Sequence, residues 1–384
     1  MKKYKILFYI KDPNGGTGKF LEHIYQGLAN NPQFEVKILT HITPHNYGFE
    51  YEQIGHQIPK QGFFALNPFV KSVQNFVNFV RYVQKYSPDI IYSFDIYANI
   101  AANLLKLFNN RIYVINSSNV NITRHIETNR TPYFTKIIRN LIFWLYPKSD
   151  AHVVPAYGIK KELIQKYNIQ EDKIYHIVYP LDIDKVKQLS SMSFDKKLSS
   201  EYIYITTMVR NDAQKDIFSL LQVIQSITKK KPNIIMRFLG IDRIPLDISK
   251  HFPHSFIKKN VQCLGWQKNP YVYIKNSDLF ILLSQYEGLP YSLIEAQSLG
   301  VPILASDVDF GPREIIQHKK NGILLKDNKV TTVLFYLNEL LENKKLRNSI
   351  GRNAKNMAKK YDQQWILPLY ISLFKSFQDS TKSK

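Results

Sequence analysis

The chain has 384 residues and a hydrophobic fraction of 44%, which excludes a disordered protein and, because the length exceeds what one core usually organises, predicts two domains. The formal net charge of +21 has three interpretations: nucleic-acid binding, attraction to an anionic membrane surface, or a generally basic proteome. We find no zinc-ligand spacing, RNA-binding aromatic motif or heptad repeat, so no nucleic-acid partner is expected.

The sequence predicts a protein of the reducing cytoplasm. No apolar run approaches the roughly twenty residues of a membrane span. The apolar run at 6–10 is short and lacks a following small-residue cleavage site, which predicts a first strand rather than a signal peptide. Cys263 is the only cysteine and excludes an internal disulfide framework. Peripheral attachment to the inner face of the membrane is a further hypothesis, motivated by the basic charge.

The first strand, turn and helix form a candidate binding segment. The run at 6–10 is followed by a glycine-rich turn with Gly15 and Gly16, a helical pattern at 20–28 and a strand at 34–39. Such a βαβ opening lets an anion or a sugar approach the backbone of the turn. The turn matches neither a Walker A loop nor a complete dinucleotide-binding motif. A tight turn without a ligand is the alternative.

The rest of the first half alternates strands and helices. Strands are predicted at 88–93, 112–115, 151–154 and 174–178. The polar residues 116–119 directly follow the second of these strands, where a Rossmann-like domain places ligand contacts.

Two helical patterns in this half have a predicted inner face. The first begins at Pro68, and its apolar stripe is Phe69, Val73, Phe76, Val77 and Val80. The second covers 132–147, and its predicted core face is Phe134, Ile137, Ile138, Leu141 and Leu145. An interfacial helix is the less favoured alternative for the second pattern. The residues that suit an interface are Tyr133, Lys136, Arg139, Phe143 and Trp144.

The second half begins after a predicted linker at 184–201, which is charged and rich in serine. Strand and helix alternation then resumes, with strands expected at 202–209, 234–239 and 261–264 and a helix at 217–227. Each half is therefore predicted to be a parallel sheet covered on both faces by helices.

The stretch at 284–316 carries the densest signal. A buried strand at 279–283 is followed by Gly288 and Pro290, which end it, and by a helix with Ser292 in its first turn. A strand end, a glycine turn and a helix N-terminus present free N–H groups to a phosphate. Glu287 and Glu295, separated by seven residues, suit sugar or ribose hydroxyls. The alternative is an ordinary loop with two solvated acids.

These motifs, in this order and at these distances, resemble the GT-B glycosyltransferases, specifically the large retaining family 4, which uses activated sugar donors. The resemblance extends over nearly the whole chain. The segments that carry it are 14–16, 88–92, 148–154, 179–182, 209–216, 287–295 and 311–316.

The resemblance implies an α/β protein of the GT-B class, with two Rossmann-like domains whose parallel sheets face across a donor and acceptor cleft. The N-terminal, acceptor-side domain is expected at 1–183, with a C-terminal helix at 362–378 packing back on it. The nucleotide-sugar-binding domain is expected at 184–361.

The resemblance also assigns roles to residues. Arg210 and Lys215 would grip the diphosphate and neutralise the leaving group, and with Glu287 they are the implied catalytic residues. Main-chain amides of Gly288 and Leu289 would join them. Glu295 would hold the ribose and Glu287 the donor sugar. The implied donor site comprises Gly15, Gly16, Arg210, Lys215, Glu287, Gly288, Leu289, Pro290, Ser292 and Glu295.

Two departures from the family pattern affect the expected site. The family often has a sugar-contacting histidine after the strand that ends here at Ile115, and this chain has none before His125. Val209 also replaces a usual glycine, which bears on how closely that loop approaches a ligand. The candidates for acceptor or sugar contacts are Asn116, Ser118, Asn119 and His125.

The expected function is transfer of a hexose or an N-acetylhexosamine from a UDP-sugar to a cell-envelope glycan, lipid-linked or teichoic-type acceptor. No metal and no cofactor besides the nucleotide-sugar donor is expected, and Asp307 and Asp309 are interpreted as loop residues. The alternatives are a catalytically inert GT-B partner subunit, or an epimerase or phosphorylase of the same fold. The sequence does not specify the sugar, the acceptor or the oligomeric state.

Overall fold

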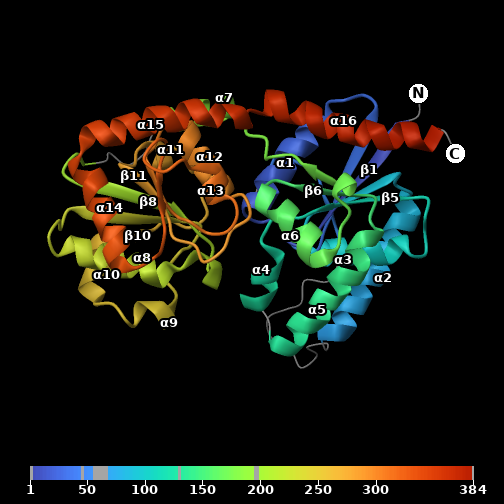
Figure 1. Cartoon of the computed structure of the whole chain (residues 1–384), viewed down its shortest axis with the longest axis horizontal. Helices are drawn as coiled ribbons and strands as arrows, with labels where there is room; N and C mark the ends of the chain where they lie inside the picture. The colour runs from blue at the N-terminus through green and yellow to red at the C-terminus, as the bar shows by residue number, and fades with distance from the viewer. Residues whose placement is uncertain (1–2, 45–46, 55–67, 129–130, 194–198, 383–384) are drawn as a thin grey trace. The chain divides into compact units, whose positions relative to one another are not determined.

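The computed structural model describes residues 3–44, 47–54, 68–128, 131–193 and 199–382. The chain forms two compact units, Met1–Pro180 with Ile366–Lys384, and Leu181–Trp365. It passes from one unit to the other after Pro180 and again within the last helix, α16 (Gln363–Lys382) (Figure 1).

The first crossing lies after Pro180 rather than after residue 183, because Leu181 is tied to the second unit. Its N–H donates to the Tyr361 carbonyl over 2.8 Å, and its carbonyl accepts from Gln363 N–H over 2.9 Å. On the other side of the second crossing, the Tyr370 hydroxyl donates to the Ile177 carbonyl over 3.3 Å within the first unit.

Within its described residues, the first unit has a seven-stranded parallel sheet in the order β3-β2-β1-β4-β5-β6-β7. The strands are β1 Tyr4–Ile10, β2 Phe34–Thr40, β3 Glu52–Gln53, β4 Ile90–Ser93, β5 Tyr113–Ser117, β6 Ala151–Val154 and β7 Ile174–His176. The α-helices that connect them are α1 Gly16–Ala29, α2 Pro68–Tyr86, α3 Ile96–Lys106, α4 Ile122–Thr128, α5 Pro132–Leu145 and α6 Tyr157–Tyr167.

The inner strand β1 shows why this sheet is covered on both faces. Successive side chains of a strand point to opposite faces, and β1 is apolar at nearly every position. Phe8 packs against Phe374 of α16, with ring centroids 6.5 Å apart. Its neighbour Tyr9 stacks on Phe79 of α2 at 4.1 Å. The two helices therefore lie on opposite sides of the sheet.

The second unit has, in the residues described, a six-stranded parallel sheet in the order β10-β9-β8-β11-β12-β13. The strands are β8 Ile203–Met208, β9 Ile234–Leu239, β10 Val261–Cys263, β11 Leu279–Leu282, β12 Ile303–Ser306 and β13 Ile323–Leu325. The α-helices are α7 Ile183–Ser190, α8 Ile217–Thr228, α9 Leu246–Ser249, α10 His254–Asn260, α11 Tyr271–Lys275, α12 Tyr291–Ser298, α13 Pro312–Ile315, α14 Val330–Glu342 and α15 Lys344–Ala358.

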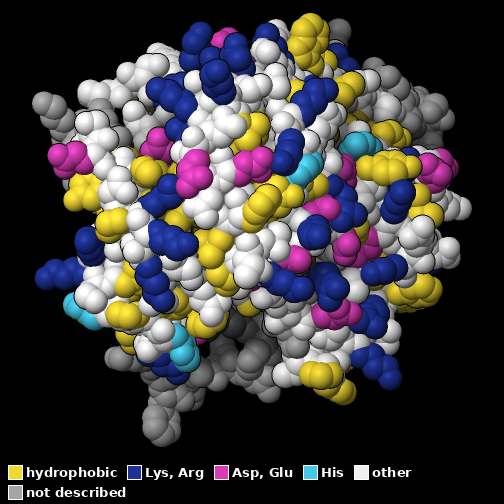
Figure 2. Space-filling model, turned by 60° about the vertical axis from the view of Figure 1, so that its left-hand side comes forward, with side chains coloured by type: hydrophobic (Ala, Val, Ile, Leu, Met, Phe, Trp, Pro, Cys, Tyr) yellow, Lys and Arg dark blue, Asp and Glu magenta, His cyan; other side chains and the backbone are white. Residues whose placement is uncertain are grey.

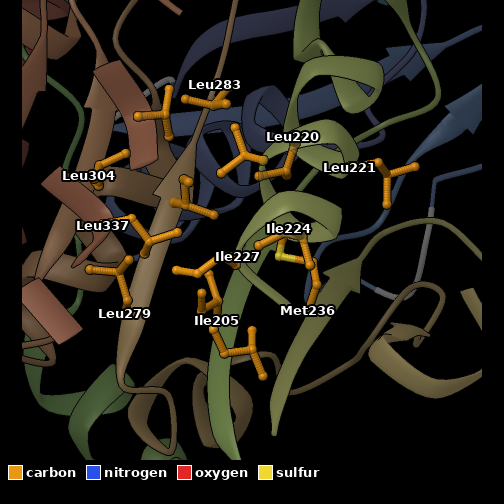
Figure 3. Close-up of a cluster of buried hydrophobic side chains, with 14 of the residues drawn as sticks. Ile205, Leu220, Leu221, Ile224, Ile227, Met236, Leu279, Leu283, Leu304 and Leu337 are labelled. Carbon is orange, nitrogen blue, oxygen red and sulfur yellow. The ribbon is translucent and has the colours of Figure 1, made fainter. Parts of the chain in front are cut away.

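Figure 3 shows the core of the second unit, where one face of α8 meets the strands. Leu220 and Ile224 of α8 point toward the sheet, and Ile205 of β8 and Met236 of β9 are fully buried among them. This packing holds β8 and β9 in place, and with them the starting points of the loops that follow these strands. Both sheets and their flanking helices bear out the predicted α/β class of parallel sheets.

The predicted linker at 184–201 is wrong over its first part, because residues 183–190 form α7. The Asp182 side chain caps this helix by accepting from Lys185 N–H over 2.9 Å, and Val186 is buried. Asn269 Nδ2 donates to the Leu189 carbonyl over 2.9 Å and fixes the end of the helix. Lys185 and Lys187 lie on the exposed face of α7, whereas Ser190 at its end is buried.

The predicted stripes of α2 and α5 are borne out in part. Phe76 and Val80 of α2 pack against the core and Leu145 of α5 is buried, as predicted, but other members of both stripes are exposed. In α2, Val73 and Val77 are exposed, and Phe79 and Val83 are buried instead; the side chain of Phe69 lies outside the described part. The reason is that apolar residues occupy more than one side of the helix, so their periodicity fits several rotations. In α5, Phe134 and Ile137 are exposed and the buried residues are Thr135, Ile142 and Leu145.

No helix in the described part of the chain is both long enough and apolar enough to cross a membrane. Lys and Arg side chains are dispersed over the face shown in Figure 2, among acidic and hydrophobic ones.

Candidate functional site

The best-formed candidate site lies at the carboxyl edge of the second sheet, where β11 ends and α12 begins. Ser284 N–H donates to Ser306 Oγ over 3.0 Å, which fixes the loop after β11 to the neighbouring strand β12. Gly311 has a φ of 69°, and a Cβ at this position would collide with the Gly288 carbonyl. Glycine is therefore required there, and the two loops meet backbone to backbone.

Glu287 is buried in this loop, with 5% of its surface exposed, and it accepts three hydrogen bonds. The donors are Lys215 Nζ at 2.6 Å, Ser284 Oγ at 2.6 Å and Gln214 Nε2 at 3.2 Å. Lys215 and Glu287 thus form a buried ion pair, since only 12% of the Lys215 side chain is exposed. A buried carboxylate needs such partners because it has lost its hydration.

The position of Lys215 follows from the turn between β8 and α8. Residues 213–215 form one 3-10 turn, and Asp216 follows in the left-handed region with φ 39°. The Asp216 carboxylate caps α8 by accepting from Ser219 N–H over 3.3 Å. Gln214 ties the turn to the opposite loop, since its carbonyl accepts from Gln285 N–H over 2.8 Å. Lys215 is consequently aimed at Glu287.

Arg210 forms an ion pair of its own. Its guanidinium forms an ion pair with Asp212 Oδ2 at 3.3 Å, and 56% of its side chain is exposed. Its neighbour Val209 points into the hydrophobic core. Gly240, with a φ of 103°, packs against the Val209 carbonyl. The side chain that replaces the usual glycine therefore does not fill the ligand side of the loop.

Glu295 lies in the second turn of α12 and is 1% exposed. The Tyr271 hydroxyl of α11 donates to its Oε1 over 2.9 Å. The interpretation of Glu287 and Glu295 as two solvated acids is wrong, because both carboxylates are buried and held by named donors. Gly288, Leu289 and Pro290 are also buried, and Ser292 is half-buried in the first turn of α12.

The glycine turn of the first unit is held by Tyr47. Gly15 N–H donates to the Tyr47 hydroxyl over 3.1 Å, and that hydroxyl lies 3.1 Å from the Gly15 carbonyl, to which it donates. Gly15 has a φ of 100° and precedes the first turn of α1, whereas Gly16 is exposed. The Gly15 amide is therefore occupied by a protein group in this structure.

Asn116 is not at a strand end, which corrects its expected place among the ligand contacts. Strand β5 extends to Ser117, and Asn116 is fully buried. Its Oδ1 accepts from Ser93 Oγ at 3.2 Å and from Asn103 Nδ2 at 3.0 Å. It belongs to a polar network inside the unit, joined by Asn99, whose Oδ1 accepts from Ser93 Oγ at 2.7 Å.

The other three acceptor candidates lie beyond β5. The Ser118 hydroxyl is buried and makes no hydrogen bond to any described residue. Asn119 Oδ1 accepts from Ser117 Oγ at 2.9 Å and from the Tyr179 hydroxyl at 3.1 Å. His125 is half-buried in α4. The Ser118 hydroxyl therefore has spare hydrogen-bonding capacity, as has the buried Nδ2 of Asn116.

A second polar group gathers at the same edge of the first sheet. Asp95 accepts from Lys11 N–H at 2.6 Å and from Ala98 N–H at 2.8 Å, and burial raises the pKa of its carboxyl. The Tyr9 hydroxyl lies 2.8 Å from His41 Nε2. Burial, and then the charge of Lys11, lower the pKa of His41 to about 4, so its imidazole is neutral at pH 7.

Two sequence families match this chain. Residues 14–185 match the family described as Glycosyltransferase Family 4, and residues 190–357 match the one described as Glycosyl transferases group 1. The chain belongs to the group 1 glycosyltransferases. Its two parallel α/β units have the GT-B fold.

Three curated relatives of this glycosyltransferase are informative. An uncharacterized glycosyltransferase of Methanocaldococcus jannaschii is 26% identical over 65% of this chain and 63% of its own length. A Campylobacter jejuni N-acetylgalactosaminyltransferase named for a diphospho-undecaprenol substrate is 24% identical over 69% of this chain and 70% of its own. The poly(ribitol-phosphate) α-N-acetylglucosaminyltransferase of Staphylococcus aureus is 28% identical over 42% of this chain, but only 33% of its own length is matched. The match thus spans less than two thirds of the first and third relatives.

Solved structures confirm the fold of the glycosyltransferase. Anabaena HepE, in complex with UDP and glucose, superimposes with a TM-score of 0.75 at 16% identity, over 97% of this chain and 100% of its own. Sucrose-phosphate synthase of Thermosynechococcus elongatus gives a TM-score of 0.77 at 15% identity, over 98% and 100%.

The sequence did not reveal three side chains that hold the carboxylates. Gln214 and Ser284 bind Glu287, and Tyr271 binds Glu295. Ser284 and Gln214 adjoin residues of known motifs, which is the only signal they carry. Tyr271 precedes Glu295 by 24 positions on another helix, so nothing in the sequence pairs them. Among the described residues, no cluster of His, Cys, Asp and Glu is arranged to hold a metal ion, and Asp307 pairs with Arg313 at 2.9 Å.

Proposed function

We propose that this glycosyltransferase is a retaining enzyme that moves a hexose or an N-acetylhexosamine from a UDP-sugar to a cell-envelope glycan, on a lipid-linked or teichoic-type acceptor. The buried Lys215–Glu287 pair at the start of α12 carries the donor part of the proposal. UDP is favoured because Anabaena HepE was solved with UDP and glucose. The names of the Campylobacter and Staphylococcus relatives support the two acceptor classes.

In the proposed donor site, Lys215 exchanges its partner Glu287 for the diphosphate of the donor when the donor binds. A diphosphate offers Lys215 Nζ more negative charge than the single carboxylate that it now contacts at 2.6 Å. When Lys215 turns to the diphosphate, Glu287 stays in place because Ser284 and Gln214 still donate to it. Glu287 then accepts from a hydroxyl of the donor sugar and positions its reacting carbon.

The remaining donor contacts follow from the same loops. Arg210 has only an exposed pair with Asp212 to give up, and such pairs contribute about 0–1 kcal/mol, so its guanidinium is available for the diphosphate. The N–H groups of Gly288 and Leu289 lie at the start of α12, whose dipole favours phosphate. Glu295 would accept from the ribose hydroxyls.

The chemical step is proposed to occur on one face of the donor sugar. The glycosidic bond to the diphosphate breaks, and the two cations stabilise the charge that develops on the leaving group. A phosphate oxygen takes the proton of the acceptor hydroxyl as that hydroxyl bonds to the same face of the sugar. The proposed reaction steps use no cofactor besides the donor. Ser118, Asn119 and His125 are the proposed acceptor contacts.

The acceptor class also suggests where the enzyme works. An acceptor on a lipid carrier, or a polymer assembled on one, is reached at a membrane surface. We therefore place the proposed reaction in the cytoplasm at the inner face of the membrane.

The test is a donor assay with site variants. A thermal-shift screen of UDP-, GDP- and ADP-sugars identifies the nucleotide, because a bound donor raises the Tm by mass action. Arg210→Ala, Lys215→Ala and Glu295→Ala should each lower UDP-sugar turnover by at least about tenfold, the loss of one hydrogen bond to a charged group. Full activity in all three variants would sink the site assignment. Isomerised donor in the absence of acceptor would point to an epimerase instead.

A further inference from the structure

Helix α5 presents apolar and mostly aromatic side chains to solvent. Its buried side is formed by Thr135, Ile142 and Leu145. A surface helix of a globular protein normally turns polar residues outward, and an exposed apolar cluster of this kind marks an interaction site. We call the five exposed residues the α5 outer face. They are Tyr133 at 72% exposed, Phe134 at 55%, Ile137 at 37%, Phe143 at 53% and Trp144 at 58%.

The spacing of these residues makes them one surface rather than scattered exceptions. Tyr133, Ile137 and Trp144 are separated by four and seven positions, which places them along one line of an α-helix. Phe134 and Phe143 lie about 90° to either side of this line, on the two flanks of the exposed half of the helix. Thr135 and Ile142, also seven positions apart, lie on the opposite side and are buried.

The charges on α5 have one sign. The helix contains Lys136 and Arg139 and neither Asp nor Glu. Arg139 pairs with Glu127 at 3.1 Å, but both side chains are more than 40% exposed, so the pair is weak in water. Aromatic side chains beside lysine and arginine are the composition of helices that lie in the headgroup layer of a bilayer.

We propose that the α5 outer face binds the surface of an anionic lipid bilayer. The aromatic side chains would enter the headgroup layer, and Lys136 and Arg139 would contact lipid phosphates. The whole-chain charge of +21 favours this occupant over a second copy, because two such chains repel each other whereas an anionic surface attracts each one.

The inference rests on the proposed function, since a lipid-linked acceptor lies in such a surface. Helix α5 is also fixed to the helix that carries an acceptor candidate. Thr135 Oγ1 donates to the Ile126 carbonyl over 3.1 Å, and Ile126 follows His125 in α4. Thr135 lies on the side of α5 opposite the outer face, so α4 and its His125 would be separated from a bilayer there by the thickness of α5.

The test is co-sedimentation of the full chain with vesicles. Equal parts of phosphatidylglycerol and phosphatidylcholine should bind the protein, phosphatidylcholine alone should bind it much less, and added salt should weaken binding. The double variant Phe143→Ser, Trp144→Ser should bind the anionic vesicles at least about tenfold less, because each inserted aromatic side chain contributes roughly that factor. Phe335→Ser, at a residue 64% exposed on α14, is the matched control and should bind like the wild type.

A second variant changes charge without touching the apolar residues. Lys136→Glu should weaken binding to the anionic vesicles and leave binding to phosphatidylcholine unchanged. Wild-type binding by both variants contradicts the proposal, as does binding that salt leaves unaltered. A wild-type dimer in sedimentation velocity that the double variant loses would assign the α5 outer face to a second copy.

The outcome is separable from that of the donor proposal. Vesicle binding without a thermal shift by any nucleotide sugar would leave the α5 surface standing and refute the donor. A thermal shift by a UDP-sugar without vesicle binding would support the donor proposal and refute membrane binding by the α5 outer face.

Discussion

The buried ion pair of the candidate site allows a stability prediction with a defined size. Lys215→Met removes the cation and leaves Glu287, 5% exposed, with the donors Ser284 and Gln214. Removing one partner of a buried pair costs about 3–5 kcal/mol, and we expect the lower end because two donors remain. The second unit spans Leu181–Trp365, and for a domain of this size about 3 kcal/mol lowers the Tm by roughly 6–12 °C.

Differential scanning calorimetry of a set of variants tests this reasoning. Lys215→Met combined with Glu287→Gln removes both charges and should recover most of the lost stability, which gives a coupling free energy of about 2–3 kcal/mol. Lys231→Met is the matched control, since its pair with Glu342 at 3.1 Å is exposed and should contribute about 0–1 kcal/mol. A Lys215→Met variant no less stable than the Lys231→Met control would refute the buried-pair argument.

Two further predictions use single side chains. Tyr271→Phe removes the hydroxyl that holds Glu295, so KM for the donor should rise roughly three- to tenfold with little change in kcat; an unchanged KM would separate Tyr271 from donor binding. Burial lowers the pKa of His152 from 6.5 to about 4, so the unfolded chain binds a proton at higher pH than the folded one. This contribution to stability is complete above pH 6.5 and should fall by up to about 3 kcal/mol as pH drops toward 4. Between pH 6.5 and 4, the Tm of His152→Gln should depend less on pH than the Tm of the wild type. An equal pH dependence of Tm in the two proteins would contradict the lowered pKa of His152.

The strands were predictable where apolar runs are short and bounded by turn residues. The run at 279–283 becomes β11, and the turn signals Gly288 and Pro290 lie before the start of α12. The end of β5 was not predictable in this way, because its ladder continues through polar residues. Asn116 pairs with His152 and Ser117 with Val153 on β6, so the strand outlasts its apolar run by two positions.

Helix existence was predictable, but which side chains of a helix are buried was predictable only in part. In α5, apolar residues lie on several sides of the helix, so their periodicity does not say which side is buried. Contacts with α4 and α3 decide the burial, and these contacts cannot be read from the sequence pattern. The carboxylates of the candidate site were found from their spacing. Their partners lie far away in sequence, such as Lys215 for Glu287, and only the fold brings them together.

The contact between Gly311 and Gly288 restricts where the proposed donor site is open to redesign. The loops after β11 and β12 touch through main-chain atoms, so any side chain at position 311 would displace the loop that carries Glu287. Gln285, by contrast, has an exposed side chain in the same loop, and its anchoring to Gln214 uses only the N–H group. A library that aims to change donor preference should therefore vary position 285 and leave Gly311 untouched.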